Sequence, residues 1–400
     1  MTRTAGGAAP ILTRRALNRA TVGRQGLLER AAMPALEMVG RLVAVQAQEP
    51  DAPYLGLWTR LESFGHDELT RLLGDRLVVR SSVLRGTQHL VTAEDYPWLR
   101  PLVQPVLERT QRGHFGRRTA GMDLAELASA ARGLLAGRTL TRPQLRDLLA
   151  ERWPDRDPQA LIWTAQALVP VIHPPPAGTW RWRGATPFTL AEEWLGQPLA
   201  APTAPEALLR RYLTAFGPAS VADVQSWSGL SRLGEVAERL RGELRSFRDD
   251  AGRELLDLPD APLADPDVPA PVRFLPAFDN LLLGHADRTR VLSDEHRGLV
   301  VQGLAAVLVD GFVRAVWTIT WEGGAAILVV EALDDQLPAA DRAAVTEEGA
   351  RLLAFAAADA TRHDLRFAPL PQPTEPSARG PSRRPAATPA RPSPNADGHR

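Results

Sequence analysis

The 400-residue sequence contains no cysteine and no lysine. Without cysteine the chain has no disulfides, no thiolate zinc site, no iron–sulfur cluster and no cysteine nucleophile. It also lacks the run of about 18 apolar residues that a transmembrane helix needs, and its N-terminus lacks the pattern of a cleaved signal. We therefore expect a cytoplasmic protein without membrane contact.

Motifs of several large enzyme classes are missing as well. The sequence has no G-x-x-x-x-G-K-[ST], no G-x-G-x-x-G after a strand, no H-E-x-x-H and no G-x-S-x-G, which argues against nucleotidases, dehydrogenases, metalloproteases and common hydrolases. The formal net charge is zero, and the final thirty residues hold five arginines against two acids. A surface that binds nucleic acid must then be a local patch, because the overall charge of the protein does not favour it.

A chain of this length is expected to form two to four modules. One pattern recurs three times: a capped helix, a turn, a second helix and a two-stranded ribbon, which is the winged-helix arrangement. We predict an α+β fold of tandem winged-helix domains with a strand-rich C-terminal part. The expected domains are 1–125, 126–203 and 204–370, followed by a disordered Pro/Arg-rich tail over 371–400.

The third copy of the pattern is the clearest. Ser220 and Asp223 form a capping box, and Gly229 marks the turn between two helices. The expected elements after this turn are a helix over 231–241 and strands over 244–248 and 253–258.

The other segments follow similar signals. Thr141 and Gln144 form a capping box in the second copy, and Asp310 with Gly311 marks a hairpin turn near the C-terminus. Expected helices are 14–19, 27–32, 35–46, 145–152, 161–168 and 339–358, and expected strands are 77–80, 84–91 and 180–183.

Two glutamines are unusual in their position. Gln46 continues the helical spacing of Val39 and Val43, where another aliphatic residue is expected. Pro50 should end that helix soon after Gln48, so both amides can turn toward one cleft. From the residues alone, the favoured interpretation is that these glutamines bond free carbonyls at a helix end.

Three segments resemble the AlkZ/YcaQ family of winged-helix DNA glycosylases: VQAQEPDAPYLGLW, VLRGTQHLVTAEDY and LPAFDNLLLGHADRTRV. They occur in the family's order, and the resemblance covers about residues 10–370. It implies a C-shaped array of winged helices. The active-site signature of the AlkZ-like branch is Gln, an aliphatic residue and Gln, which corresponds here to Gln46, Ala47 and Gln48.

The resemblance implies a monofunctional DNA glycosylase that hydrolyses the N-glycosidic bond of N7-alkylated purines, including bulky adducts. Whether it also unhooks interstrand crosslinks is left open, as is the choice between DNA repair and resistance to a self-made toxin. The expected partner is double-stranded DNA carrying alkylated bases, bound by a monomer at the nucleoid. We expect Gln46 and Gln48 to hold the attacking water jointly, with no cofactor and no metal.

Candidate DNA contacts lie on the predicted first wing, where alternate residues of a strand share one face. These contacts are Arg80, Ser82, Arg85, Thr87 and His89. Inward packing of part of this row is an equal alternative.

A second set of candidate contacts is Arg181 and Arg183, in a ribbon that enters a groove of the DNA. The alternative, which we favour, is that the tryptophans of this ribbon cover the core.

One polar cluster and two rival functions remain. The cluster comprises Asp279, Asn280, His285, Asp287 and Arg288, whose spacing favours a hydrogen-bonded network over a metal site. The first rival function is a winged-helix transcriptional regulator that binds one undamaged operator without catalysis. The second is a relative that kept the fold and lost the activity.

Overall fold

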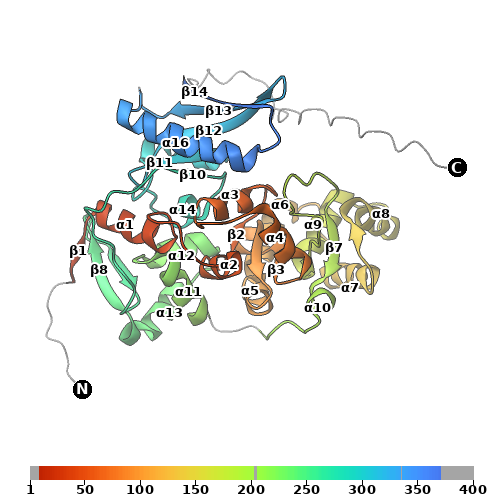
Figure 1. Cartoon of the computed structure of the whole chain (residues 1–400). Helices are drawn as coiled ribbons and strands as arrows, with labels where there is room; N and C mark the ends of the chain where they lie inside the picture. The colour runs from red at the N-terminus through yellow and green to blue at the C-terminus, as the bar shows by residue number, and fades with distance from the viewer. Residues whose placement is uncertain (1–8, 202–204, 335, 371–400) are drawn as a thin grey trace.

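The computed structural model describes residues 9–201, 205–334 and 336–370, so the predicted tail over 371–400 lies outside the described residues. Helices alternate with four small sheets in this part of the chain, three with three strands and one with five. Figure 1 shows three helix-and-sheet units in a row, with the five-stranded sheet packed above them. The fold is α+β, with tandem winged-helix units and a strand-rich C-terminal part, as the sequence predicts.

The first unit occupies the middle of the row in Figure 1. Its sheet has the order β2-β4-β3, and two further helices lead from it to the second unit. The elements are α2 (Ala35–Arg41), β2 (Val45–Gln46), α3 (Ala52–Trp58), α4 (His66–Gly74), β3 (Val78–Ser82), the 3-10 turn η1 (Leu84–Gly86), β4 (Gln88–Thr92), α5 (Tyr96–Leu102) and α6 (Gln104–Phe115).

The second unit has its own apolar core and the sheet order β5-β7-β6. The predicted capping box is present at its second helix, where Thr141 and Gln144 exchange hydrogen bonds. The elements are α7 (Leu124–Leu135), β5 (Leu140–Thr141), α8 (Arg142–Arg152), α9 (Pro158–Leu168), β6 (Val171–Ile172), β7 (Pro187–Leu190) and α10 (Ala191–Leu195).

The third unit includes the N-terminal strand of the described chain. Ile11 and Leu12 pair in parallel with Arg248 and Asp249, which completes the sheet order β1-β8-β9. The third unit also shares one continuous apolar core with the first unit. The elements are β1 (Ile11–Leu12), α1 (Arg14–Arg24), α11 (Glu206–Phe216), α12 (Val221–Ser228), α13 (Leu233–Arg239), the 3-10 turn η2 (Arg241–Glu243), β8 (Arg245–Asp249) and β9 (Glu254–Asp257).

The C-terminal part is a five-stranded sheet in the order β10-β11-β12-β13-β14, with α16 packed on it (Figure 1). Asp310 and Gly311 both have positive φ, at 49° and 78°, and form the predicted hairpin turn between β11 and β12. The elements are β10 (Arg273–Leu275), α14 (Asn280–Leu283), the 3-10 turn η3 (Asp294–His296), α15 (Arg297–Val301), β11 (Ala305–Val309), β12 (Phe312–Glu322), β13 (Ala325–Ala332), α16 (Ala339–Ala356) and β14 (Arg362–Pro369).

Two predicted helices of the first unit are wrong in whole or in part. Residues 27–32 form no helix, because Gly26, with φ 68°, ends α1 and Ala31 bridges to Leu61 in an extended conformation. The helix predicted over 35–46 ends at Arg41. Val43 then takes a φ of 65°, and Val45 and Gln46 pair with β4, so pairing with a distant strand overrides the helical spacing.

Two predicted strands are also wrong in whole or in part. The strand predicted over 84–91 begins only at Gln88, because residues 84–86 form the turn η1 with Arg85 at φ 54°. The strand predicted over 180–183 is irregular, and the ribbon of the second unit is built from β6 and β7 instead. No helix in the described part of the chain is both long and apolar enough to cross a membrane.

Candidate active site

A cavity of about 670 Å³ lies between the first and second units, and we call it the interunit cavity. Its walls come from the loop after β2, from the first wing, from α6, α8 and α9, and from the loop before β7. The lining residues are Gln48, Glu49, Pro50, Arg80, Ser82, Arg85, Gly86, Thr87, Gln88, Leu107, Thr110, Gln111, His114, Phe115, Arg142, Trp163, Gln166, Ala167, Trp182, Arg183, Gly184 and Thr186.

The two signature glutamines have different surroundings. Gln48 is exposed and lines the interunit cavity. Gln46 is 6% exposed, and its Oε1 accepts hydrogen bonds from Thr87 Oγ1 at 3.3 Å and from Arg85 at 3.5 Å. Thr87 and Arg85 both line the cavity, so Gln46 lies directly behind the wall that Gln48 faces.

The backbone that carries these glutamines is held from three sides. Arg80 donates two hydrogen bonds to the carbonyl of Ala47, at 3.0 and 3.1 Å. The amide of Ala47 donates to the carbonyl of Gln88 in β4 at 2.8 Å. Asn280 of α14 donates to the carbonyl of Ala44 at 2.8 Å. Three elements, β3, β4 and α14, therefore hold the backbone of this segment in place.

The charge of the cavity wall is positive. Four arginines line it, namely Arg80, Arg85, Arg142 and Arg183, and Glu49 is the one acid among the lining residues. Burial lowers the pKa of Arg80, Arg85 and Arg142 to about 10, which leaves all three protonated at neutral pH. The protein as a whole is neutral, so this wall is the kind of local basic patch that a DNA phosphate would meet.

The side-chain hydrogen bonds of Arg80, Arg85 and Arg142 go to oxygens without formal charge. Arg80 bonds the Ala47 carbonyl, Arg85 bonds the Trp227 carbonyl and the Gln46 amide, and Arg142 bonds the Gln166 amide at 2.9 Å. Because these acceptors are neutral, they orient the guanidinium groups without neutralising them.

Most of the predicted DNA contacts meet at this cavity. Arg80, Ser82, Arg85 and Thr87 all line it. Ser82 is buried, and its hydroxyl accepts hydrogen bonds from Gln88 at 2.8 Å and Gln166 at 2.9 Å, which ties the first wing to α9.

His89 is the exception on the first wing. It is 1% exposed, lies outside the cavity lining and contacts the carbonyl of Thr87 at 2.9 Å. Burial lowers its pKa to about 3, so it is neutral at physiological pH. His89 is paired with Gln46 and Ser81, whereas Arg80 and Ser82 are paired with Leu90 and Gln88, so His89 lies on the opposite face of the sheet from these two residues. This is the inward packing of part of the row that we gave as the equal alternative.

The two arginines of the Pro-rich loop also separate. Arg183 lines the cavity and forms an ion pair with Asp51 at 2.8 Å. Arg181 lies outside the lining and pairs with Asp359 at 2.8 Å. Trp180 packs on Tyr54, with ring centroids 5.5 Å apart, so this tryptophan covers the core as the favoured alternative predicts.

Sequence reasoning missed the second wall of the cavity. Residues of α6, α8 and α9 form this wall, among them His114, Phe115, Arg142, Trp163 and Gln166. The available signal was the pair Trp163 and Gln166, which lie three residues apart and therefore on one face of a predicted helix.

Four side chains of the polar cluster, those of Asp279, Asn280, His285 and Asp287, form hydrogen bonds, each with partners outside the cluster. Asp279 holds Arg60 in a buried two-point ion pair, with contacts of 2.6 and 2.8 Å. His285 contacts the carbonyl of Phe216 at 2.9 Å, and Asp287 accepts hydrogen bonds from Thr289 and Arg253. These bonds tie the C-terminal part to the first and third units.

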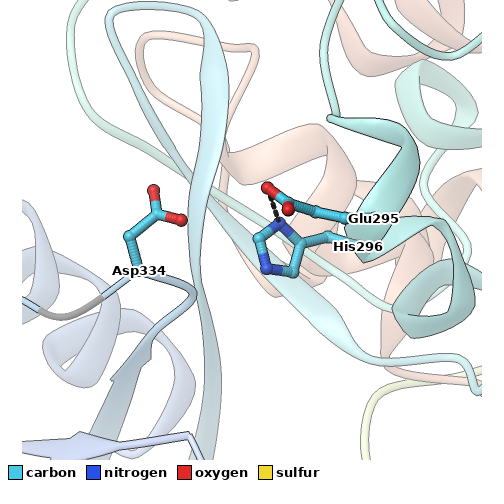
Figure 2. Close-up of side chains that lie close together, drawn as sticks. All are labelled: Glu295, His296 and Asp334. Carbon is cyan, nitrogen blue, oxygen red and sulfur yellow. Dashed lines mark ion pairs between the residues drawn. The ribbon is translucent and has the colours of Figure 1, made fainter.

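One group outside the cavity has the side chains of a cation site. Glu295, His296 and Asp334 each offer a ligand atom, and these atoms lie within 4.8 Å of one another (Figure 2). However, His296 Nδ1 already contacts Ser293 at 2.8 Å, and Asp334 is half exposed beside Arg314 at 3.6 Å. We assign no function to this surface group.

Comparisons with known proteins show the family of the chain. The model of the AlkZ-like DNA glycosylase family matches residues 39–355. The interstrand DNA cross-link repair glycosylase of Streptomyces sahachiroi is 26% identical over 341 residues, which cover 74% of this chain and 85% of that protein. The solved structure of the Streptomyces sahachiroi DNA glycosylase AlkZ aligns with a TM-score of 0.73 and 24% identity, over 90% of this chain and all of that one. The family match decides against the transcriptional regulator, and the chain belongs to the AlkZ-like DNA glycosylases.

Proposed function

We propose that this protein hydrolyses the N-glycosidic bond of N7-alkylated purines in double-stranded DNA, including bulky adducts, and that it acts as a monomer. The observation that carries this proposal is the position of Gln48 on the wall of an arginine-lined cavity, with Gln46 directly behind it. The relative from Streptomyces sahachiroi is named for interstrand crosslinks, and we extend the proposal to that class of substrate. Such an activity serves DNA repair or resistance to a genotoxin.

The chemistry needs little acid catalysis. A purine alkylated at N7 carries a positive charge, so the bond between the sugar C1′ and the base nitrogen breaks with its electron pair going to a base that leaves neutral. Water then bonds to C1′ of the oxocarbenium-like sugar and releases a proton to solvent. Amide groups that hold this water and stabilise the developing cation are sufficient for that step. We assign this role jointly to Gln46 and Gln48.

The basic wall supports the choice of substrate. Guanidinium groups at Arg80, Arg85, Arg142 and Arg183 suit the phosphates of the strand that carries the lesion. An open cavity beside them also spares the enzyme from swinging a bulky adduct into a closed pocket.

The deciding experiment is base release from a duplex with a single N7-methylguanine, followed by alkaline cleavage of the abasic strand. We expect Gln46→Ala and Gln48→Ala each to slow release about 100-fold, the usual cost of losing one positioned polar group. Gln225→Ala is the matched control, because Gln225 accepts a hydrogen bond from the backbone of Leu233 in the third unit. Full activity in both signature variants would contradict the proposed site.

Glu49 offers an independent check of the mechanism. It is the one carboxylate of the cavity lining, and most glycosidases activate water with a carboxylate. If the amides alone position the water, Glu49→Gln should change the rate of base release less than about threefold at neutral pH. A loss as large as that of Gln48→Ala would move the role of general base to Glu49.

A further inference from the structure

The wall of the interunit cavity on the side of the second unit presents flat side chains. Trp163 of α9 is 39% exposed and lines the cavity, although the large side chain of tryptophan is usually mostly buried. A single exposed apolar side chain on an open surface needs no explanation. The neighbours of Trp163 make it unusual, because they are flat as well.

Two neighbours fix the orientation of the indole ring. Phe115 of α6 lies nearly parallel to it, at an interplanar angle of 11° and a centroid distance of 6.3 Å. The guanidinium of Arg142 lies 4.1 Å from the centroid of the indole ring. Arg142 is itself held by the Gln166 amide at 2.9 Å. The indole therefore cannot turn freely, and we call Trp163, Phe115 and Arg142 the aromatic wall.

The aromatic wall shares the cavity with the catalytic amide. Gln48 and Trp163 both line the same volume of about 670 Å³, which is in the range of sites that hold drug-sized ligands, about 300–1,000 Å³. A methylated purine is smaller than such ligands, so the cavity has room for a substituent beside the reacting base. A planar substituent on an ordered indole gains stacking energy that a flexible or saturated one does not.

We propose that the aromatic wall binds the planar aromatic group of a bulky N7 adduct, and that it makes aryl-bearing lesions the preferred substrates. This inference rests on the proposed function, because it names the class of adduct that the same site accepts. The contact is made by Trp163, while Phe115 and Arg142 keep the indole in position.

The test uses three duplexes that differ only in the N7 substituent: methyl, cyclohexylmethyl and benzyl. The last two have a ring of similar size, but only benzyl is aromatic. For the wild-type protein we expect the ratio of base-release rate to Kd to be at least about fivefold higher for benzyl than for cyclohexylmethyl, the lower limit for one stacked ring.

Three variants connect this preference to the aromatic wall. Trp163→Leu should abolish the benzyl preference, measured as the ratio of benzyl to cyclohexylmethyl, whereas Trp163→Phe should restore most of this ratio. Trp321→Leu is the matched control, because Trp321 of β12 is 42% exposed and lies outside the cavity lining. A wild type without preference for benzyl, or an equal loss on all three duplexes in Trp163→Leu, would overturn the inference.

Failure of the proposed function can be told apart from failure of this inference. The Kd values are measured on the same three duplexes with a 2′-fluorinated sugar, which resists hydrolysis. If the wild type releases none of the three bases, the proposed function is wrong. The Kd values still show whether the aromatic wall prefers the benzyl group. Tighter binding of the benzyl duplex that Trp163→Leu removes then supports the aromatic wall, and equal binding of all three duplexes refutes it.

Discussion

The first and third units have wings of the same architecture, but the arginines of the two units have different kinds of hydrogen-bond partner. In the third unit, Arg241 and Arg253 each bind two carboxylates, one of which is Asp287 of the C-terminal part, so their charge is neutralised within the protein. In the first wing, Arg80 and Arg85 bond backbone carbonyls and an amide oxygen. In the third unit these arginines therefore form stabilising ion pairs. In the first wing the arginines keep their positive charge at the interunit cavity.

The pKa values follow the same division. Hydrogen bonds to Glu238 and Glu254 raise the pKa of Arg241, whereas burial lowers the pKa of Arg80 and Arg85 to about 10. A guanidinium that is desolvated but lacks a close carboxylate among its hydrogen-bond acceptors gains more from a phosphate than one already paired. If the first wing binds DNA as we propose, one scaffold serves structure in one copy and recognition in another.

The substitution with the largest expected effect on base release is Arg80→Lys. An ammonium group cannot reproduce the two bonds that the Arg80 guanidinium donates to the single carbonyl oxygen of Ala47, so the signature segment should shift and base release should fall about 100-fold. Release of N7-methylguanine under single-turnover conditions measures the effect. Arg253→Lys in the third wing should remain within about threefold of wild type, and equal losses in both variants would contradict the division of roles.

Acid sensitivity should be shared by the two units. Burial lowers the pKa to about 3 for His89 in the first unit and for His285 of the C-terminal part, which contacts Phe216 of the third unit. Both histidines therefore stay neutral when folded and take up protons when unfolded below about pH 6.5. The free energy of unfolding should therefore decrease as the pH is lowered, by up to about 2 kcal/mol per histidine between pH 6.5 and pH 5. Urea unfolding at these two pH values should show this loss reduced in His89→Asn and, to a similar extent, in His285→Asn. An unchanged pH dependence in either variant would show that this histidine has the same pKa in the folded and the unfolded protein.

Loss of a helix cap should affect stability alone. Ser220 accepts from the Asp223 amide at 3.2 Å and begins α12 of the third unit, so Ser220→Ala should lower the free energy of unfolding by about 1 kcal/mol. Base release at 25 °C should stay at the wild-type rate. The first unit offers the control Pro34→Ala, because α2 begins at Pro34 without a side-chain cap. A selective loss of activity in Ser220→Ala would mean that the third unit takes part in the chemistry.

The smallest effect concerns the salt dependence of DNA binding. Arg183 is exposed on the cavity wall, so Arg183→Ala should reduce the slope of log K against log salt by about one, with weaker binding to every sequence. Titrations of a lesion duplex at several salt concentrations measure this slope. Arg241→Ala should leave it unchanged, because Arg241 lies outside the lining of the interunit cavity.

Local sequence signals predicted the third unit well. The capping box at Ser220 is present, Gly229 has the expected positive φ of 79°, and the two strands of the wing lie within two residues of their predicted bounds. All of these signals act over a few residues, which is why they can be read without knowledge of the tertiary structure.

The first unit was predicted less well where the candidate site lies. Gln46 leaves the helical pattern because it pairs with His89, and Val43 accepts a positive φ that β-branched residues rarely adopt. Both features depend on contacts far along the chain, and such departures from local rules are typical of functional sites. The choice of glutamines rested on resemblance to the family. The aromatic wall escaped prediction because Phe115, Arg142 and Trp163 come from three separate helices.

The pairing of Ile11 with Arg248 has a consequence for synthesis. The N-terminal strand leaves the ribosome first, yet its partner strand is made only after both of the other winged-helix units. Completion of the third sheet must therefore wait until most of the chain has emerged, and closure of so long a loop slows folding. Residues 11–12 are thus expected to pair with β8 late in folding. A nascent chain stalled before β8 would expose the unpaired strand β1 to chaperones and proteases.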